Sequence, residues 1–374
     1  TLHGETWAEL PAAQYGVEEC ANLRNVPRAA STASASAVTA VERPAHHRAN
    51  GGFGNPWPAS APQGIGGLLR WGYERVIHPP SKDPPASGLP VARSSYAHPR
   101  ATASSISATW VGHSTVLVQV GGINVLTDPV WSDRASPVAF AGPRRIVRPA
   151  ITLDALPPLD IILLSHNHYD HLDVPTVRAL GARHPRATWG VPLGLADFVR
   201  RRGARHIVEL DWWQEASVGS ASLACTPAQH FSARGIGDRN RTLWCSWALR
   251  AAGHAIFFGG DTAYHPEFAR IRARCGPFAL VLLPIGAYEP RWFMRSVHMN
   301  PEEAVRAYTE LVPRAERSPS TPMVPIHWGT FRLTDEPLDE PPARLTVAWR
   351  AAGLSEDALW LLRHGETRAI TVPE

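Results

Sequence analysis

The densest group of chemically versatile side chains is the run Ser165-His166-Asn167-His168-Tyr169-Asp170-His171. It places four candidate metal ligands, three imidazoles and one carboxylate, within six residues. Imidazole nitrogen and carboxylate oxygen together suit Zn²⁺ or a similar first-row metal ion. The ligands follow the predicted short buried strand Ile161–Ser165. Functional groups of α/β architectures collect where strands end, so the run predicts a metal site at a sheet edge.

Four further polar side chains hold the same position relative to a predicted strand, at or just after its end. They are Asp128, His230, Asp261 and His327. A single histidine beside a strand is most often a hydrogen-bonded structural residue. Several such residues at equivalent positions predict that their side chains meet at one rim of the fold.

The number of candidate ligands favours two metal ions over one. A purely structural zinc ion, the alternative, takes four ligands and closes its site. Seven ligands suit two ions that share a carboxylate and leave a bridging position for water. A hydroxide bridging such a pair is a nucleophile at neutral pH, so the sequence predicts hydrolysis, most naturally of a phosphodiester. The seven are His166, His168, Asp170, His171, His230, Asp261 and His327.

The elements that must position these residues are predicted from residue patterns. Strand hairpins come first, followed by mixed strands and helices, which suggests two sheets with helices outside. Helices are predicted at about 174–183, 194–202, 266–274, 300–312 and 342–352. Strands are predicted at 106–111, 115–120, 123–127, 161–165, 187–191, 206–210, 221–226, 243–250, 254–259, 278–285, 323–326 and 358–363.

The region before the first hairpin has a different composition. Residues 27–64 are rich in Ala, Ser, Pro and Gly and predict a mostly disordered or draped segment. Leu68–Ile77 predicts a helix with Leu69, Tyr73, Val76 and Ile77 on one face. Either that face packs on the catalytic domain, or it lies on a membrane surface with flanking arginines and tryptophans near the headgroups.

Composition narrows the function classes. The chain has 374 residues, 44% of them hydrophobic, and a net charge of +4, which is too small to indicate a nucleic-acid partner. No apolar run approaches the length of a membrane span, and no signal peptide is recognised. The 4 cysteines form no CxxC pair, so no disulfide scaffold is expected. These features are compatible with an intracellular protein and leave peripheral membrane association open.

Longer blocks of sequence resemble one known family. They include Trp110–Thr115, Leu126–Pro129, Arg134–Pro137, Ser165–Asp173, Val191–Leu195, Glu209–Trp213, Gly260–Thr262, Pro284–Met294 and Ile326–Phe331. The metal signature marks the metallo-β-lactamase superfamily. The block Pro284–Met294 resembles the N-acylphosphatidylethanolamine-hydrolysing phospholipase D family within it. The resemblance covers about Phe53 to Thr367.

The resemblance implies a fold, a reaction and a set of roles. The fold is an αββα sandwich of the α/β (α+β) class, with a largely irregular N-terminal extension. Two zinc ions per chain are implied, with the bridging carboxylate from Asp261. The reaction releases N-acylethanolamine and leaves phosphatidic acid from a phospholipid at a membrane surface, with a homodimer expected. His166, His168 and His230 would hold one ion, and Asp170, His171 and His327 the other.

Other side chains receive roles around the metals. His298 matches a family histidine that faces the lipid phosphate, and it joins Asp170 and Asp261 as a predicted catalytic residue. Asp128 is expected to orient a ligand imidazole. Arg291 and Arg234 are candidates to hold the phosphate, with structural ion pairs as the alternative. Tyr288 and Trp292 are candidates to line the acyl route, with core packing as the alternative. His113, near the rim, is treated as structural, with a contact to a metal ligand as the alternative.

The predicted organisation has three parts. They are a loosely ordered extension at 1–52, a helix-bearing segment at 53–105 and a hydrolase domain at 106–374. The predicted function is a dizinc phosphodiesterase of the phospholipase D type. The alternatives are a hydrolase of the same fold acting on another phosphodiester, a lactone or RNA, and a zinc-stabilised membrane adaptor.

Overall fold

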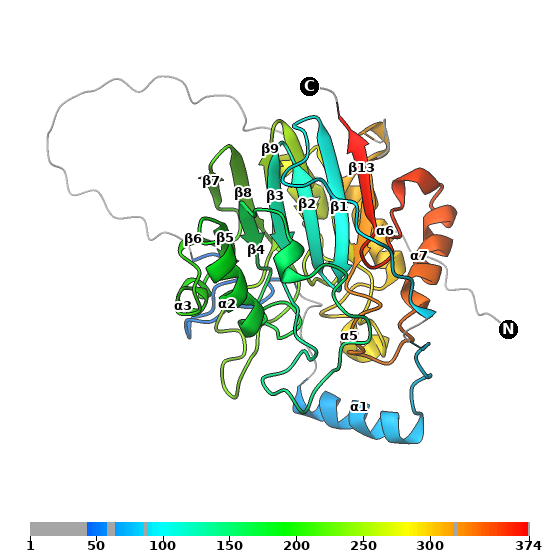
Figure 1. The fold of residues 1–374 in the computed structure, drawn as a ribbon. Helices are drawn as coiled ribbons and strands as arrows, with labels where there is room; N and C mark the ends of the chain where they lie inside the picture. The colour runs from blue at the N-terminus through cyan, green and yellow to red at the C-terminus, as the bar shows by residue number, and fades with distance from the viewer. Residues whose placement is uncertain (1–42, 58–63, 86–87, 317–320, 373–374) are drawn as a thin grey trace, which may run out of the picture. The chain divides into compact units, whose positions relative to one another are not determined.

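The computed structural model describes residues 43–57, 64–85, 88–316 and 321–372 (Figure 1). These residues belong almost entirely to one compact unit, Pro44–Glu374. The part of the predicted N-terminal extension at 1–42 lies outside the described residues. The three-part division of the chain stays a prediction.

The first sheet has seven strands in the order β13-β1-β2-β3-β4-β5-β6. Strands β1, β2 and β3 form the predicted hairpins, and β3, β4, β5 and β6 run parallel to one another. Its strands are β1 (Ser105–Gly112), β2 (Thr115–Val120), β3 (Ile123–Thr127), β4 (Ile161–Leu163), β5 (Thr188–Pro192), β6 (His206–Leu210) and β13 (Thr367–Thr371).

The second sheet has six strands in the order β12-β11-β10-β9-β8-β7. Strands β10, β11 and β12 run parallel, so their carboxyl ends share one edge. Its strands are β7 (Glu215–Val218), β8 (Ala221–Thr226), β9 (Ser246–Ala251), β10 (His254–Phe258), β11 (Phe278–Pro284) and β12 (Met323–Ile326).

Side chains at alternate positions along the strands of the first sheet point into two different apolar layers. Val116, Val118 and Val120 of β2 face the core between the sheets, whereas Leu117 faces the opposite layer. This follows from the two-residue period of a strand. The inter-sheet core also contains the buried rings of Trp110 and Trp247, which belong to different sheets.

Helices cover the outer faces of both sheets, so the αββα sandwich implied by the resemblance is confirmed (Figure 1). Helices α2 and α3 pack on the first sheet, and α4, α6 and α7 cover the second. The helices are α1 (Ile65–Ile77), α2 (Val174–Arg183), α3 (Ala196–Arg200), α4 (Phe268–Cys275), α5 (Arg291–Met294), α6 (Pro301–Leu311) and α7 (Glu340–Ala351). Short 3-10 helices lie at Leu153–Ala155, Arg314–Glu316 and Glu356–Ala358.

Two edge elements differ from the sequence prediction. The predicted strand at 358–363 is wrong, because that buried apolar run makes only isolated contacts, such as Trp360 N donating to Met323 O. The strand is instead Thr367–Thr371, which pairs with β1 and is largely exposed. The short edge strand Glu215–Val218 was not predicted. Edge strands lack the apolar alternation that identifies a buried strand.

Helix α1 forms as predicted, but its apolar face does not pack on the domain. Leu69, Tyr73 and Val76 are 70%, 68% and 78% exposed. The opposite side of the helix holds it in place. Trp71 Nε1 donates to Asp335 Oδ2 at 2.6 Å, and Trp292 Nε1 donates to Glu74 Oε2 at 3.0 Å. Among the described helices, none combines the length and apolar character needed to cross a bilayer.

Candidate metal centre

The histidine-rich run forms the loop between β4 and α2, at the carboxyl end of β4. Arg234 holds the backbone of this loop, because its Nη1 donates to the carbonyls of Asn167 and Leu172 at 2.7 and 2.6 Å. The guanidinium also lies 3.9 Å from the ring centroid of Tyr169. The loop therefore presents its candidate ligand side chains from a backbone held by a partly buried cation.

Three imidazoles gather on one side of the centre and are called here the first set: His166, His168 and His230. His168 Nδ1 lies 2.8 Å from His166 Nε2 and 3.2 Å from His230 Nε2. The remaining nitrogen of His230 is 2.9 Å from the Val297 carbonyl, so Nδ1 donates there and Nε2 is left as a ligand atom. These separations suit three nitrogens around one ion.

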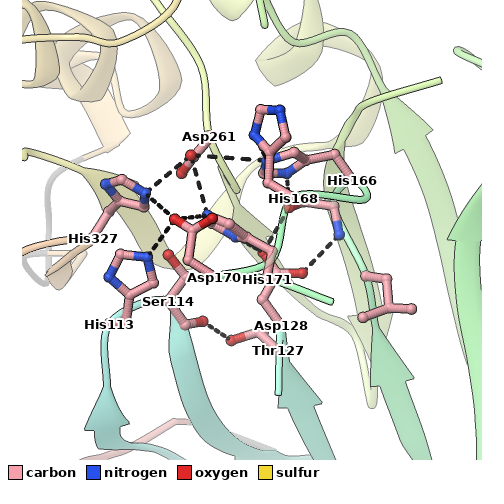
Figure 2. A network of polar contacts seen from close by, with 12 residues as sticks. His113, Ser114, Thr127, Asp128, His166, His168, Asp170, His171, Asp261 and His327 are labelled. Carbon is pink, nitrogen blue, oxygen red and sulfur yellow. Dashed lines mark hydrogen bonds and ion pairs between the residues drawn. The ribbon is translucent and has the colours of Figure 1, made fainter. Parts of the chain in front are cut away.

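A second set consists of Asp170, His171 and His327 (Figure 2). Oδ2 of Asp170 lies 3.3 Å from His171 Nε2 and 3.4 Å from His327 Nε2. The elements that carry these residues are far apart in the sequence, since His327 follows β12 of the other sheet. The packed sheets thus bring their carboxyl edges to one rim, as the sequence predicted.

Asp261 lies between the two sets. Its Oδ2 is 3.1 and 3.0 Å from Nε2 of His171 and His327, and 4.0 and 3.8 Å from Nε2 of His166 and His230. A carboxylate at this distance from both sets can contribute to two ions. The structure therefore brings all seven predicted ligands together.

Unsatisfied polar atoms test whether a metal fits here. Asp261 Oδ1, His171 Nε2 and His327 Nε2 are buried and have no hydrogen-bond partner among the described residues. A buried polar atom without a partner costs about 1–3 kcal/mol. Bound cations would satisfy these atoms, and the all N/O donor set matches divalent first-row metals.

Protonation states also suit cation binding. Burial lowers the pKa of His168 to about 3 and that of His230 to about 4, so both are neutral at pH 7. Burial also lowers the pKa of His171, but the Asp261, Asp170 and Asp128 carboxylates together raise it well above its ordinary value. Burial raises the pKa of Asp261, but His171 and His327 hold it well below its usual range. Without a cation, the centre thus places ionised carboxylates beside neutral His168 and His230 and a protonated His171, whose extra proton a bound cation would replace.

Asp128 performs the orienting role that the sequence predicted. Its Oδ2 is 2.6 Å from His171 Nδ1, and Ser165 N donates to its Oδ1 at 2.7 Å. The backbone at Asp128, His113 and His327 is left-handed, with φ of 31°, 56° and 63°. Non-glycine residues adopt this region rarely, and such strain concentrates at functional sites.

His298 lies at the rim beside Asp261, with Nδ1 4.0 Å from Asp261 Oδ2. Arg291 holds the backbone of this histidine, because its Nη1 donates to the His298 carbonyl at 3.0 Å. Its Nη2 donates to both oxygens of Glu303, at 3.0 and 2.9 Å. Glu303 in turn completes the capping box of α6 with Asn300.

Two of the predicted substrate-binding side chains, those of Tyr288 and Arg234, make hydrogen bonds within the protein. Tyr288 is fully buried, and its hydroxyl donates to Glu340 at 2.6 Å. Arg234 supports the ligand loop as described above. Both arrangements match the structural alternatives, and the roles of Tyr288, Arg234 and Arg291 in substrate binding stay predictions.

His113 lies at the rim, where it contacts a candidate ligand, as in the alternative to a purely structural role. Its Nε2 lies 3.0 Å from Asp170 Oδ2, and its ring centroid is 4.2 Å from that of His327. Burial lowers the pKa of His113 to about 3, so the imidazole is neutral and can donate to Asp170. Its place directly after β1, equivalent to the other strand-end ligands, is the sequence signal that identifies it.

Comparisons with known proteins show which family the chain resembles. Residues 123–328 match the family described as Beta-lactamase superfamily domain. An uncharacterised protein of Mycobacterium tuberculosis is 44% identical over 322 residues, covering 86% of this chain and 84% of that protein. N-acyl-phosphatidylethanolamine-hydrolyzing phospholipase D 1 of Caenorhabditis elegans is 43% identical over 253 residues, covering 65% of this chain and 69% of that protein.

Among solved structures, the metallo hydrolase Igni18 of the archaeon Ignicoccus hospitalis shares the fold. The TM-score is 0.52 at 21% identity, over 71% of this chain and 98% of that chain. The matched family and the curated relatives agree with the sequence resemblance. The chain therefore belongs to the N-acylphosphatidylethanolamine-hydrolysing phospholipase D family of the metallo-β-lactamase superfamily and is a metal-dependent hydrolase.

Proposed function

We propose that the chain is a dizinc phosphodiesterase of the phospholipase D type that hydrolyses N-acylphosphatidylethanolamine to N-acylethanolamine and phosphatidic acid. The observation that carries this proposal is the pair of ligand sets with Asp261 between them. Histidine and carboxylate donors suit zinc in particular. The C. elegans relative, which is named for this reaction, supports the choice of substrate.

The residues around the centre have distinct duties in this proposal. When bound, two divalent ions supply Lewis acidity toward a phosphoryl oxygen and lower the pKa of the attacking water. Burial holds the pKa of His298 well below its ordinary value, so at pH 7 this imidazole is neutral and offers one N–H. That N–H suits a hydrogen bond to a phosphoryl oxygen, and Arg291 keeps the residue in place.

The apolar face of α1 supports a substrate held in a membrane. Leu69, Tyr73 and Val76 lie exposed on one side of α1, and the Trp71 ring on the other side packs at a tilt against Phe293 of α5, with ring centroids 5.1 Å apart. Helix α5 leads directly to His298. A phospholipid surface is the occupant we propose for this face, because the substrate of the proposed reaction resides there.

The decisive assay is the release of N-acylethanolamine from N-acylphosphatidylethanolamine micelles by zinc-loaded protein in H₂¹⁸O. We expect ¹⁸O in the phosphatidic acid, because water attacks phosphorus, and no release by Asp261→Ala. Release of a different fragment would refute the phospholipase D type. No release from protein that holds two zinc ions would refute the lipid substrate and direct the search to other phosphodiesters and lactones.

Membrane docking has its own test with vesicles that contain the substrate lipid. The variant Leu69→Ser/Tyr73→Ser/Val76→Ser should sediment with vesicles at least about tenfold more weakly, since each apolar side chain contributes on the order of 1 kcal/mol. Val347→Ser is the matched control, because Val347 is 69% exposed on the distant helix α7. Equal binding by the triple variant and the control would refute docking through α1. Light scattering of the same preparations tests the predicted homodimer.

A further inference from the structure

A second group of metal-ligand side chains lies outside the centre described above. His46 Nε2 is 2.6 Å from Asp211 Oδ1, and His47 Nε2 is 2.7 Å from Asp211 Oδ2. The His46 and Asp211 side chains are only 8% and 12% exposed, whereas His47 is 28% exposed. Two imidazoles from adjacent residues thus converge on one carboxylate that is more than 160 residues away in the sequence.

Neighbouring groups fix the orientation of all three side chains. The His46 ring stacks on Trp212 with centroids 4.3 Å apart, and the His47 ring meets Phe53 edge-on at 5.1 Å. Asp211 Oδ1 also accepts from Trp212 N at 2.8 Å. Partners of this kind, which hold a ligand ring or carboxylate from outside, are typical of built metal sites.

We propose that His46, His47 and Asp211 bind a third divalent metal ion, with zinc as the cation that best suits two imidazoles and one carboxylate. The nitrogen–oxygen separations are a few tenths of an ångström shorter than the 3.0–3.4 Å found between His327 or His171 and the carboxylates of the catalytic centre. A small outward rotation of the partly exposed His47 admits an ion, and solvent completes the coordination. Binding an ion through Nε2 requires each imidazole to carry its proton on Nδ1.

The ion would have a structural effect that reaches the catalytic rim. His46 and His47 lie near the start of the segment Pro44–Trp57. The Asn55 side chain of the same segment contacts the backbone of the candidate ligand His230. Asn55 Nδ2 donates to the His230 carbonyl at 2.9 Å, and its Oδ1 accepts from Trp244 Nε1 at 3.1 Å. A metal that fixes the segment to the corner after β6 therefore supports the position of a catalytic ligand.

Metal content per chain tests the proposal without relying on activity. The background variant His166→Ala/His327→Ala removes one ligand from each catalytic set. After zinc loading and removal of free zinc, we expect this background to retain one tightly held ion, and the added His47→Gln change to abolish it. His206→Gln, at an exposed histidine at the opposite end of β6 from Asp211, is the control and should retain the ion.

Cobalt substitution supplies a second readout. Co²⁺ in the His166→Ala/His327→Ala background should give a visible absorption spectrum that both His47→Gln and Asp211→Asn remove. Asp211→Asn preserves the size of the side chain, so circular dichroism is expected to show an intact fold. The proposal is overturned if the background holds no zinc, or if folded His47→Gln and Asp211→Asn variants hold as much zinc and cobalt as the background.

Discussion

Asp128→Asn is the substitution that most directly tests how the chain prepares a ligand imidazole. Asp128 is fully buried and accepts three hydrogen bonds, from Ser165 N, Ser165 Oγ and His171 Nδ1, at 2.7, 2.6 and 2.6 Å. The contact with His171 keeps the proton on Nδ1 and leaves Nε2 free to bind a metal. Asparagine has nearly the same shape but cannot accept on both sides of its side chain.

The magnitude follows from the two ways in which the amide can sit. If its NH₂ faces His171, the ring must accept at Nδ1 and carry its proton on Nε2, the atom 3.1 Å from Asp261. If the amide is reversed, its NH₂ opposes the backbone N–H of Ser165, which costs about 1–3 kcal/mol. Changes to such outer partners typically weaken metal binding about 10–100-fold, or about 1.4–2.7 kcal/mol.

The assay is a competition titration with a zinc chelator that measures the affinity of the more weakly held ion. Asp173→Asn is the matched control, because Asp173 is also buried and accepts from Ser132 Oγ at 2.8 Å and from Thr176 Oγ1. Asp173 contacts no candidate ligand side chain among the described residues, so its variant should lose stability and keep its zinc affinity. A folded Asp128→Asn protein with unchanged affinity for both ions would refute the tautomer argument.

Three further predictions concern the same centre. His166→Ala or His230→Ala should remove one ion and nearly all activity while circular dichroism stays native, and full activity in both would contradict the ligand assignment. His298→Ala should lower turnover about 10²–10⁴-fold with zinc content unchanged. Arg291→Ala, which removes the hydrogen bond to the His298 carbonyl, should lower turnover less. Loss of zinc from His298→Ala would make that residue a ligand instead. Chelation should lower the melting temperature by several degrees in scanning calorimetry, because an ion at 100 times its Kd stabilises the fold by about 2.7 kcal/mol; an unchanged melting temperature would show that the ions do not bind preferentially to the folded state.

The metal rim was predictable because it depends on local pattern. His166, Asp261 and His327 each follow a short apolar run, and the carboxyl ends of parallel strands share an edge. The orienting role of Asp128 follows from the same placement. The sequence resemblance to the phospholipase D family and the sandwich fold are likewise confirmed.

The partners of the arginines were not predictable, because a charge pattern does not reveal which buried carbonyls lack a donor. Arg291 lies within a motif of the resemblance and Arg234 lies outside those motifs, yet both donate to the backbone of residues at the candidate metal centre. The misplaced last strand has a similar origin. The apolar run at 358–363 is buried without joining a sheet, whereas the polar run Thr367–Thr371 joins the edge of one.

The apolar face of α1 shows how a sequence pattern can identify a helix and leave its partner open. An amphipathic period predicts that one side meets an apolar environment, but it does not say whether that environment is protein or lipid. The polar side settles the orientation here, since Trp71 and Glu74 are held by Asp335 and Trp292. One side of α1 makes hydrogen bonds to its own domain, and the other side leaves Leu69 and Val76 exposed. The apolar side is therefore directed away from that domain. This arrangement places the exposed apolar face beside the segment that carries His298, so a membrane docked there as proposed would present its phosphodiester close to that residue.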